Sequence, residues 1–476
     1  MSRIKQRYVH FVIMFLITGI ICLCPSFGQI TPYGMRVLGV FIGVLYGWIF
    51  IDLIWPSIFG FVALGLTGVS TVTAALSSGF GNQQLLMILV TMVFAGALDE
   101  SGLNDFISTW LLKKKIFRKN PWTLIAGILL IAYILGIFGA AMAAVFLLWA
   151  VVIRIAELCG FSKKDPLISF CIVTITITAF GGSLVMPFHG GALIYEGFFT
   201  QATGVTIAYV PFIIYGFVIT ALISIILFLT GKYLLRLDAQ KFALPEEMLQ
   251  ELEQKQATKQ QRISFIILLA FIAALLLPEL LPGVPGMALL SKLGLVGIAC
   301  IAILAMNFIT VEEQPLIDLS RTFTKHVQWP LLLLLAVTFP LADAMKSADS
   351  GIMTTVSQFL APLVAGMGVT AFMIVSMVLL GLITQVTHNI VLGAMFIPFL
   401  CPLCAQMGGN QITLWFMIYI ILNAAYVTPA GSMQSAMVHG HEHMEKKYAY
   451  LFGIVNLVVT CLVLALVGIP LGNLLF

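Results

Sequence analysis

Long apolar runs separated by short polar stretches dominate this chain. A helix needs about 20 apolar residues to cross a bilayer, and runs of that length lie near 10–26, 34–51, 53–70, 83–98, 206–235, 263–281, 286–309, 329–346 and 450–475. The first run follows a basic N-terminus and has no small-residue cleavage site after it, so we interpret it as a transmembrane helix rather than a removed signal peptide. The pattern predicts an all-α polytopic membrane protein.

Four further apolar regions are interrupted. Regions 121–158 and 370–407 are each about 38 residues long, with a glycine or polar break near the middle. One long kinked helix or a re-entrant hairpin would fit either of them. Regions 166–197 and 412–438 are single spans broken by the clusters FGGSLVMPFHGG and YVTPAGS.

The distribution of basic residues favours the hairpin interpretation. With two re-entrant hairpins, about 11 transmembrane helices remain, the N-terminus is cytoplasmic and the C-terminus lies outside. This topology places 21 of the 24 Lys and Arg residues on the cytoplasmic side, as the positive-inside rule requires. Only Arg36, Lys292 and Lys346 fall outside.

Composition agrees with a membrane protein and narrows the alternatives. Hydrophobic residues make up 61% of the chain and charged residues only 9%, against roughly 25% charged in soluble domains. The net charge of +4 does not indicate a nucleic-acid partner. We interpret the pair Cys401 and Cys404 as packing residues, because a redox motif normally opens a soluble helix. The triplet His439, His441 and His443 alternates along the chain, so it does not place metal ligands on one helical face.

The two halves of the chain are related. A shift of 249 residues places 99–103 on 348–352 and 156–161 on 405–410, and it lays one hairpin break on the other. In the topology above, segment 83–98 runs inward and its mate 329–346 runs outward, so the repeats are inverted. Paired inverted repeats with broken helices are typical of secondary transporters, whose substrate site lies where the repeats meet near the membrane midplane.

The repeat divides the chain into four parts. Residues 1–33 form a cytoplasmic segment with the first helix, and the hydrophilic residues 236–262 form a cytoplasmic linker between the repeats. Repeat 1 covers 34–235, with scaffold helices in 34–70, a hairpin at 121–158 and a broken helix at 166–197. Repeat 2 covers 263–476, with scaffold helices in 263–309, a hairpin at 370–407 and a broken helix at 412–438.

The four breaks are the candidate binding elements. Each break ends one half-helix and begins another, which exposes backbone N–H groups at a positive dipole end or carbonyls at a negative one. N-termini can hold an anion, and carbonyls and hydroxyls can hold a cation such as Na⁺. The segments around the breaks contain no Lys or Arg, so an anion there must be held by amides, by Ser, Thr, Asn and His side chains, or by co-bound cations.

From about Tyr33 onward the chain resembles the divalent anion:sodium symporters, which carry dicarboxylates, citrate and sulfate and belong to the ion transporter superfamily. Each hairpin tip in that family carries Ser-Asn-Thr followed by a Pro, and each broken span carries a loop rich in Thr or Ser and Pro. Here the second tip reads His388-Asn389-Ile390 with Pro398 in place, and the second broken span reads Thr428-Pro429-Ala430-Gly431-Ser432. The first tip reads Gly139-Ala140-Ala141 with Trp149 at the Pro position, and the first broken span runs from Gly181-Gly182-Ser183 to Pro187-Phe188-His189.

The resemblance implies roles for these residues. The implied substrate-binding residues are His388, Asn389, Thr428, Pro429, Ser432, Gly139, Ala140, Pro187 and His189. The implied cation-binding residues are Thr387, Asn389, Thr428, Gly431, Gly181, Gly182 and Ser183. Ala140 has no side-chain oxygen where the family has Asn, so a sodium-independent exchanger or a proton-coupled carrier stays an alternative. Because an imidazole titrates near neutral pH, His189 and His388 could make transport pH-dependent.

The expected function is secondary active transport of a small anion, most simply a di- or tricarboxylate. The resemblance implies an elevator-type mechanism, a homodimer in the plasma (inner) membrane and Na⁺ as coupling ion, with no other cofactor. An enzyme is not expected, because the chain contains no GxSxG, paired Asp or HExxH motif. A channel could use the same breaks and stays an alternative.

Overall fold

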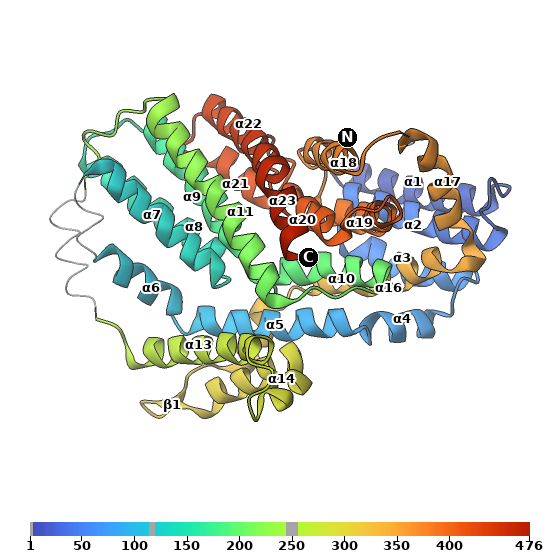
Figure 1. Ribbon diagram of the computed structural model, residues 1–476, viewed down its shortest axis with the longest axis horizontal. Helices are drawn as coiled ribbons and strands as arrows, with labels where there is room; N and C mark the ends of the chain where they lie inside the picture. Colours follow the sequence, from blue (N-terminus) through green and yellow to red (C-terminus); the bar gives the residue numbers. More distant parts are fainter. Residues whose placement is uncertain (1–2, 114–119, 244–255, 365) are drawn as a thin grey trace.

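The computed structural model describes residues 3–113, 120–243, 256–364 and 366–476, and it is almost entirely helical (Figure 1). The first half of the chain contains α1 (Arg3–Leu23), α2 (Pro32–Phe50), α3 (Ile54–Leu66), α4 (Val72–Phe80), α5 (Gln83–Glu100), α6 (Leu103–Leu112), α7 (Pro121–Ile137), α8 (Ala141–Leu158), α9 (Pro166–Ser183), α10 (Gly190–Thr203), and α11 (Tyr209–Leu229) continued by η2 (Thr230–Leu234).

The second half of the chain is also mostly helical. It contains α13 (Lys259–Leu280), α14 (Met287–Phe308), the short pair β1 (Thr310–Val311) and β2 (Gln314–Pro315), α15 (Leu319–His326), α16 (Trp329–Lys346), η3 (Ala348–Ser350), α17 (Ile352–Val364), α18 (Val369–Ile383), α19 (Asn389–Gln406), α20 (Gln411–Leu422), α21 (Met433–Gly440), α22 (Lys446–Val463), η4 (Leu464–Gly468) and α23 (Ile469–Leu475). Among the described residues, 10 helices are long and apolar enough to cross a membrane. The predicted all-α polytopic fold is confirmed.

Each interrupted region is a pair of helices. Region 121–158 divides into α7 and α8, and region 370–407 divides into α18 and α19. Because the two helices of each pair pack against one another, both regions are hairpins rather than long kinked helices. We name them the first and second hairpin. The broken spans divide in the same way, into α9 and α10 and into α20 and α21.

Local sequence explains where the first hairpin and its neighbour begin and turn. Asn120 and Thr123 form a capping box at the start of α7, and Asp165 accepts a hydrogen bond from the Leu167 N–H at the start of α9. Such caps satisfy N–H groups that have no partner within the helix. The first hairpin turns at Gly139, whose φ is +83°. L-residues with a Cβ rarely adopt this conformation.

Run 53–70 forms one helix, but this helix is shorter than a full span. The helix α3 covers 13 residues of the run, and the separate short helix α4 begins after it. The helix ends at Thr67-Gly68, where Gly68 has a φ of +69°, the left-handed conformation typical of a helix C-terminus.

The hairpins and broken helices pack on each other. The helices α7 and α8 of the first hairpin lie against α9, and α19 of the second hairpin lies between α10 and α20. The helices α1 to α4 lie at one end of the molecule, where α16 packs against α2, α3 and α4, and α14 packs against α5 (Figure 1). The helix α10 also packs against α5 and α16. These two long helices therefore connect the hairpins and broken helices with the helices at both edges.

An aromatic core joins the two repeats at α10, α11 and α20. The indole of Trp415 is fully buried and donates a hydrogen bond to the Tyr195 carbonyl at 3.0 Å. Its ring stacks on Tyr419, and Phe212 lies against Trp415 and Phe416. Truncating a buried Trp or Phe costs about 3 to 5 kcal/mol, so this core holds α10 and α20 together firmly.

Candidate functional site

A cavity of about 650 Å³ lies where the four breaks meet. Both hairpin tips contribute to its wall, as do both broken helices. The residues from these breaks are Gly139, Ala141, Met142, Ser183, Leu184, Phe188, His189, Gly191, His388, Asn389, Ile390, Asn423, Ser432, Met433 and Gln434. A cavity of this volume is typical of small-molecule binding sites.

Three helices begin at this cavity without a side-chain cap. Ala140 precedes α8, His189 precedes α10 and His388 precedes α19, and none of these three side chains accepts a hydrogen bond from its helix. The first N–H groups of α8 and α10 are thus left for another acceptor, whereas at α19 the Ile390 N–H already donates to the Asn389 Oδ1. The fourth helix that begins at this cavity, α21, differs because it is capped. The Ser432 hydroxyl accepts a hydrogen bond from the Ser435 N–H.

The cavity carries no formal charge of its own. Of the described residues that line it, none is Lys, Arg, Asp or Glu. Its polar side chains are hydroxyls, carboxamides and imidazoles. In this setting the three uncapped N-termini provide the positive potential, because each carries about half an elementary charge.

His189 is oriented by its own broken helix. Its Nδ1 lies 3.0 Å from the Ser183 carbonyl oxygen. Because a carbonyl can only accept, Nδ1 carries the proton, and the Nε2 of a neutral ring holds a lone pair. A Cβ on Gly139 would lie 3.1 Å from this Nε2. The imidazole therefore extends from α10 to the tip of the first hairpin.

The second hairpin tip places His388 and Asn389 side by side at the start of α19. Both residues line the cavity. The Asn389 Oδ1 accepts a hydrogen bond from the Ile390 N–H at 3.0 Å, so this carboxamide satisfies one of the donors of its own helix.

Gln385 organises the second break, and sequence reasoning missed it. Its Nε2 donates to the Gly381 carbonyl at 2.8 Å and to the Ala424 carbonyl at 3.4 Å, while its Oε1 accepts from the Val427 N–H at 2.9 Å. The Thr428 hydroxyl donates to the Gln385 backbone carbonyl. One buried side chain thus ties the second hairpin to the second broken helix.

The structure brings only part of the predicted site into contact with the cavity. His388, Asn389, Ser432, Gly139, His189 and Ser183 line it. The other predicted residues lie in the same breaks without lining it, namely Thr387, Thr428, Pro429, Gly431, Ala140, Pro187, Gly181 and Gly182. Sequence reasoning did not select the lining residues Thr91, Tyr195, Gln328, Tyr419 and Asn423. Of these residues, Asn423 could have been predicted from the sequence, because it is a polar residue at the end of the half-helix that precedes a predicted break.

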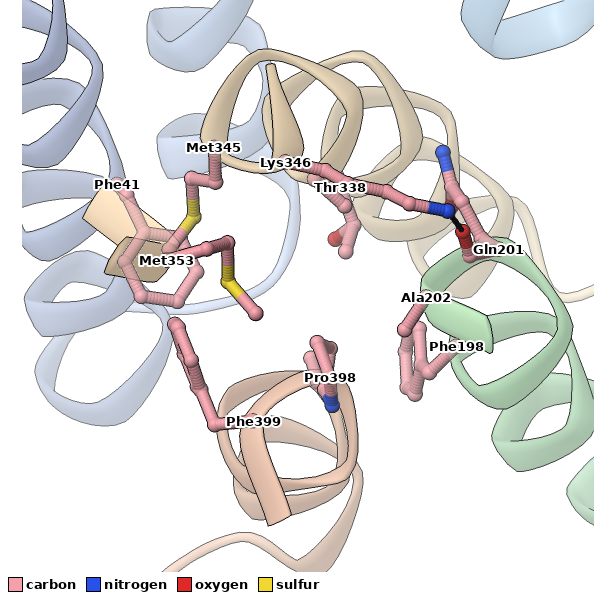
Figure 2. A pocket seen from close by; sticks show the side chains of 12 residues that line it. Phe41, Phe198, Gln201, Ala202, Thr338, Met345, Lys346, Met353, Pro398 and Phe399 are labelled. Atoms are coloured by element: carbon pink, nitrogen blue, oxygen red, sulfur yellow. Dashed lines mark hydrogen bonds between the residues drawn. The ribbon is translucent and has the colours of Figure 1, made fainter. Parts of the chain in front are cut away.

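Pro398 does not line the large cavity, and Figure 2 shows it in the wall of a different, smaller space. It lines a space of about 30 Å³ with Phe198 and Thr338 between α10, α16 and α19. Beside it, the Lys346 ammonium donates to the Gln201 carbonyl at 2.9 Å. This space can hold one or two waters but no dicarboxylate, so it is not the substrate site.

The described ranges contain no group of three or more His, Cys, Asp or Glu side chains positioned to hold a metal ion. The Asn389 carboxamide and the neighbouring N-termini instead provide N–H donors, which suit the recognition of a carboxylate. The Ser432 hydroxyl already donates to the Ala425 carbonyl at 2.8 Å. The cavity can therefore bind a small anion by hydrogen bonds alone.

Comparison with known proteins identifies relatives. The profile of the citrate transporter family, CitMHS, matches residues 41–393. No curated protein sequence matches the chain. Among solved structures, the Alcanivorax borkumensis YdaH transporter is similar with a TM-score of 0.59 and 16% identity, over 85% of this chain and 88% of that one. Neisseria gonorrhoeae MtrF, of a class of antimetabolite efflux pumps, is similar with a TM-score of 0.58 and 11% identity, over 97% of this chain and 94% of that one.

Proposed function

Since the chain belongs to the citrate transporter family, we propose that this multi-pass membrane transporter carries di- or tricarboxylates such as citrate. The family match and the two structural relatives confirm the resemblance to the ion transporter superfamily. They also show that the protein is a carrier and not an enzyme.

The observation that carries the anion proposal is the meeting of three uncapped N-termini in an uncharged cavity. A helix N-terminus stabilises an anion by up to about 2 kcal/mol in partly buried geometry. Three together provide at most about 6 kcal/mol, and a millimolar dissociation constant corresponds to roughly 4 kcal/mol. The helix ends therefore supply a favourable term for a carboxylate in the absence of Lys and Arg.

Two coupling ions have support. Na⁺ coupling follows from the carbonyls and hydroxyls of the broken helices, with Thr387, Asn389, Thr428, Gly431 and residues 181–183 as the proposed contacts. Proton coupling is the second candidate, and the orientation of His189 favours it. Its neutral Nε2 can only accept a hydrogen bond, and a carboxylate also only accepts. Binding an anion there favours a protonated His189, which then donates to the substrate.

The packing supports an elevator-type motion. The hairpins and broken helices contact one another closely, and the aromatic core of Trp415 and Tyr419 fastens α10 to α20. We propose that these elements move as one body against the edge helices, in a homodimer. The proposed location is the plasma (inner) membrane, with a cytoplasmic N-terminus and an external C-terminus.

Uptake into liposomes tests the function. The full-length protein is reconstituted and offered labelled citrate, succinate or sulfate under an inward Na⁺ gradient, an inward proton gradient or internal counter-substrate alone. We expect saturable uptake of a carboxylate and counterflow. Uptake without saturation or counterflow would indicate a channel, and no uptake of any of the three anions would contradict the proposal.

The variant His189→Gln separates the two coupling ions. A carboxamide donates hydrogen bonds at every pH, so a proton-coupled carrier would lose its dependence on the proton gradient while counterflow continues. If wild-type uptake is unaffected by a proton gradient, His189 is not a proton carrier and proton coupling is wrong.

A further inference from the structure

A second, smaller cavity lies behind the large one. Its volume is about 30 Å³, and it lies between the ends of α9 and α20 and the helices α11 and α22. The polar residues in its wall are Thr220, Ser224, Asn423, Asn456 and Thr460, and Gly181 contributes backbone. This space holds one ion or one to two waters.

The helix α22 contributes two buried polar side chains to this cavity. Asn456 and Thr460 are each only 1% exposed, and their spacing of four residues places them on the same face of the helix. In the part of the chain that the structure describes, neither side chain makes a hydrogen bond. Polar groups buried in a membrane protein need a partner. The side-chain oxygens of Asn456 and Thr460 are therefore available to bind a ligand in the cavity.

The direction of the helices that end at the small cavity determines whether it favours a positively or a negatively charged ligand. Both α9 and α20 end at the small cavity, with Gly181 and Asn423 in its wall. The C-terminus of a helix carries negative potential. Of the described residues in the wall of the small cavity, none begins a helix, so this cavity favours a cation. The large cavity contains the N-termini of α8, α10 and α19 beside the C-terminal ends of α7, α9 and α20.

The ligand atoms indicate which cation. The lining side chains offer hydroxyl and carboxamide oxygens, and Asn423 keeps its Oδ1 for a ligand because its Nδ2 donates to the Tyr419 carbonyl at 2.8 Å. Of the described residues in the wall, none is Asp or Glu. Ca²⁺ and Mg²⁺ sites usually contain carboxylates, so a monovalent cation fits better.

We propose that this cavity between α9, α11, α20 and α22 is a Na⁺ site, with Asn423, Asn456 and Thr460 as ligands. Asn423 and Leu184 line both cavities. A bound Na⁺ fixes Asn423, and with it the broken helix that forms the wall of the anion site. The coupling to transport rests on the proposed carrier function, whereas Na⁺ binding itself does not.

Thermal unfolding of the purified full-length protein tests the site without any anion substrate. Unfolding is followed in NaCl, KCl and choline chloride at matched ionic strength. A ligand that binds only the folded state raises the Tm in a concentration-dependent way. We expect NaCl to raise the Tm, while KCl and choline chloride leave it lower.

Isosteric variants locate the effect. Thr460→Val removes one oxygen ligand and is expected to raise the half-effective Na⁺ concentration by about tenfold or more. Asn456→Leu is expected to abolish the Na⁺ effect. Thr174→Val is the matched control, since Thr174 is equally buried but donates to its own helix at the Phe170 carbonyl.

Each outcome decides the proposal. Equal Tm values in NaCl and choline chloride for the wild type would overturn it, and so would an unchanged Na⁺ response in Thr460→Val. If Asn456→Leu does not fold, the milder Thr460→Val still decides. If Na⁺ raises the Tm but no anion is taken up, the Na⁺ site is supported and the proposed transport function is wrong. If an anion is taken up but Na⁺ does not raise the Tm, the transport function is supported and the Na⁺ site is wrong.

Discussion

Replacing Gln385 with Leu should loosen the second break and weaken the anion site. The carboxamide of Gln385 is buried and supplies the partners of the Gly381 carbonyl and the Val427 N–H. Leu has nearly the same volume but no polar atoms, so both backbone groups lose their partners. An unsatisfied buried group costs about 1 to 3 kcal/mol, which predicts a loss of about 2 to 6 kcal/mol in the free energy of unfolding.

Two measurements check this prediction. The Tm of purified Gln385→Leu should fall by at least about 4 °C, since 1 kcal/mol shifts the Tm of a large domain by about 2 to 4 °C. The KM for the anion should rise, because Ser432 and Asn423 lie in the break that Gln385 holds.

The matched control is Gln358→Leu, which removes an exposed carboxamide on α17. Its Tm and KM should stay close to those of the wild type. If Gln385→Leu unfolds at the same temperature as this control, the break does not depend on the Gln385 hydrogen bonds and the reasoning is wrong.

Three further changes test other parts of the site. Gly139→Ala forces a Cβ into a φ of +83° and against the neighbouring imidazole, at a cost of about 1 to 2 kcal/mol, so uptake should fall. The control Gly19→Ala, with open space around its Cβ on α1, should retain uptake. Asn389→Ala should abolish uptake with membrane expression intact, and unchanged uptake would remove Asn389 from the site. The hydrogen bond from Lys163, at 2.5 Å, holds the pKa of the Glu442 carboxyl below its usual value of 4.5. The pair of Lys163 and Glu442 therefore stabilises the fold above that value and loses this effect as the pH falls through the lowered pKa. The Tm difference between wild type and Glu442→Gln should be larger at pH 7 than near pH 3. An equal difference at both pH values would contradict this prediction.

The breaks were accessible from the sequence because their causes are local. Gly139 and the polar residues around His388 interrupt apolar runs, and clusters of such residues favour the end of a helix. The observed breaks at 138–140 and 384–388 coincide with the predicted ones. The stop at Gly68 has an equally local cause, since Thr67, Gly68 and Ser70 lie near the end of the apolar run.

The identity of the residues at each cavity depended on contacts between distant segments. Thr428 matched the expected motif, but its hydroxyl donates to the Gln385 backbone and the residue does not line the large cavity. Tyr195 and Tyr419 carry no motif and enter the wall because the aromatic core brings α10 and α20 together.

The sequence by itself determined a polytopic helical transporter with two related halves and a break in each hairpin and broken helix. Hydropathy, glycine and proline act over a few residues, so a linear pattern is sufficient to locate them. Only the tertiary structure decided which helix ends meet, because a pattern does not specify how segments 249 residues apart pack. That packing brings the N-termini of α8, α10 and α19 to the large cavity, and it brings the C-terminal ends of α9 and α20 to the wall that both cavities share. It also places Asn456 and Thr460 in the small cavity.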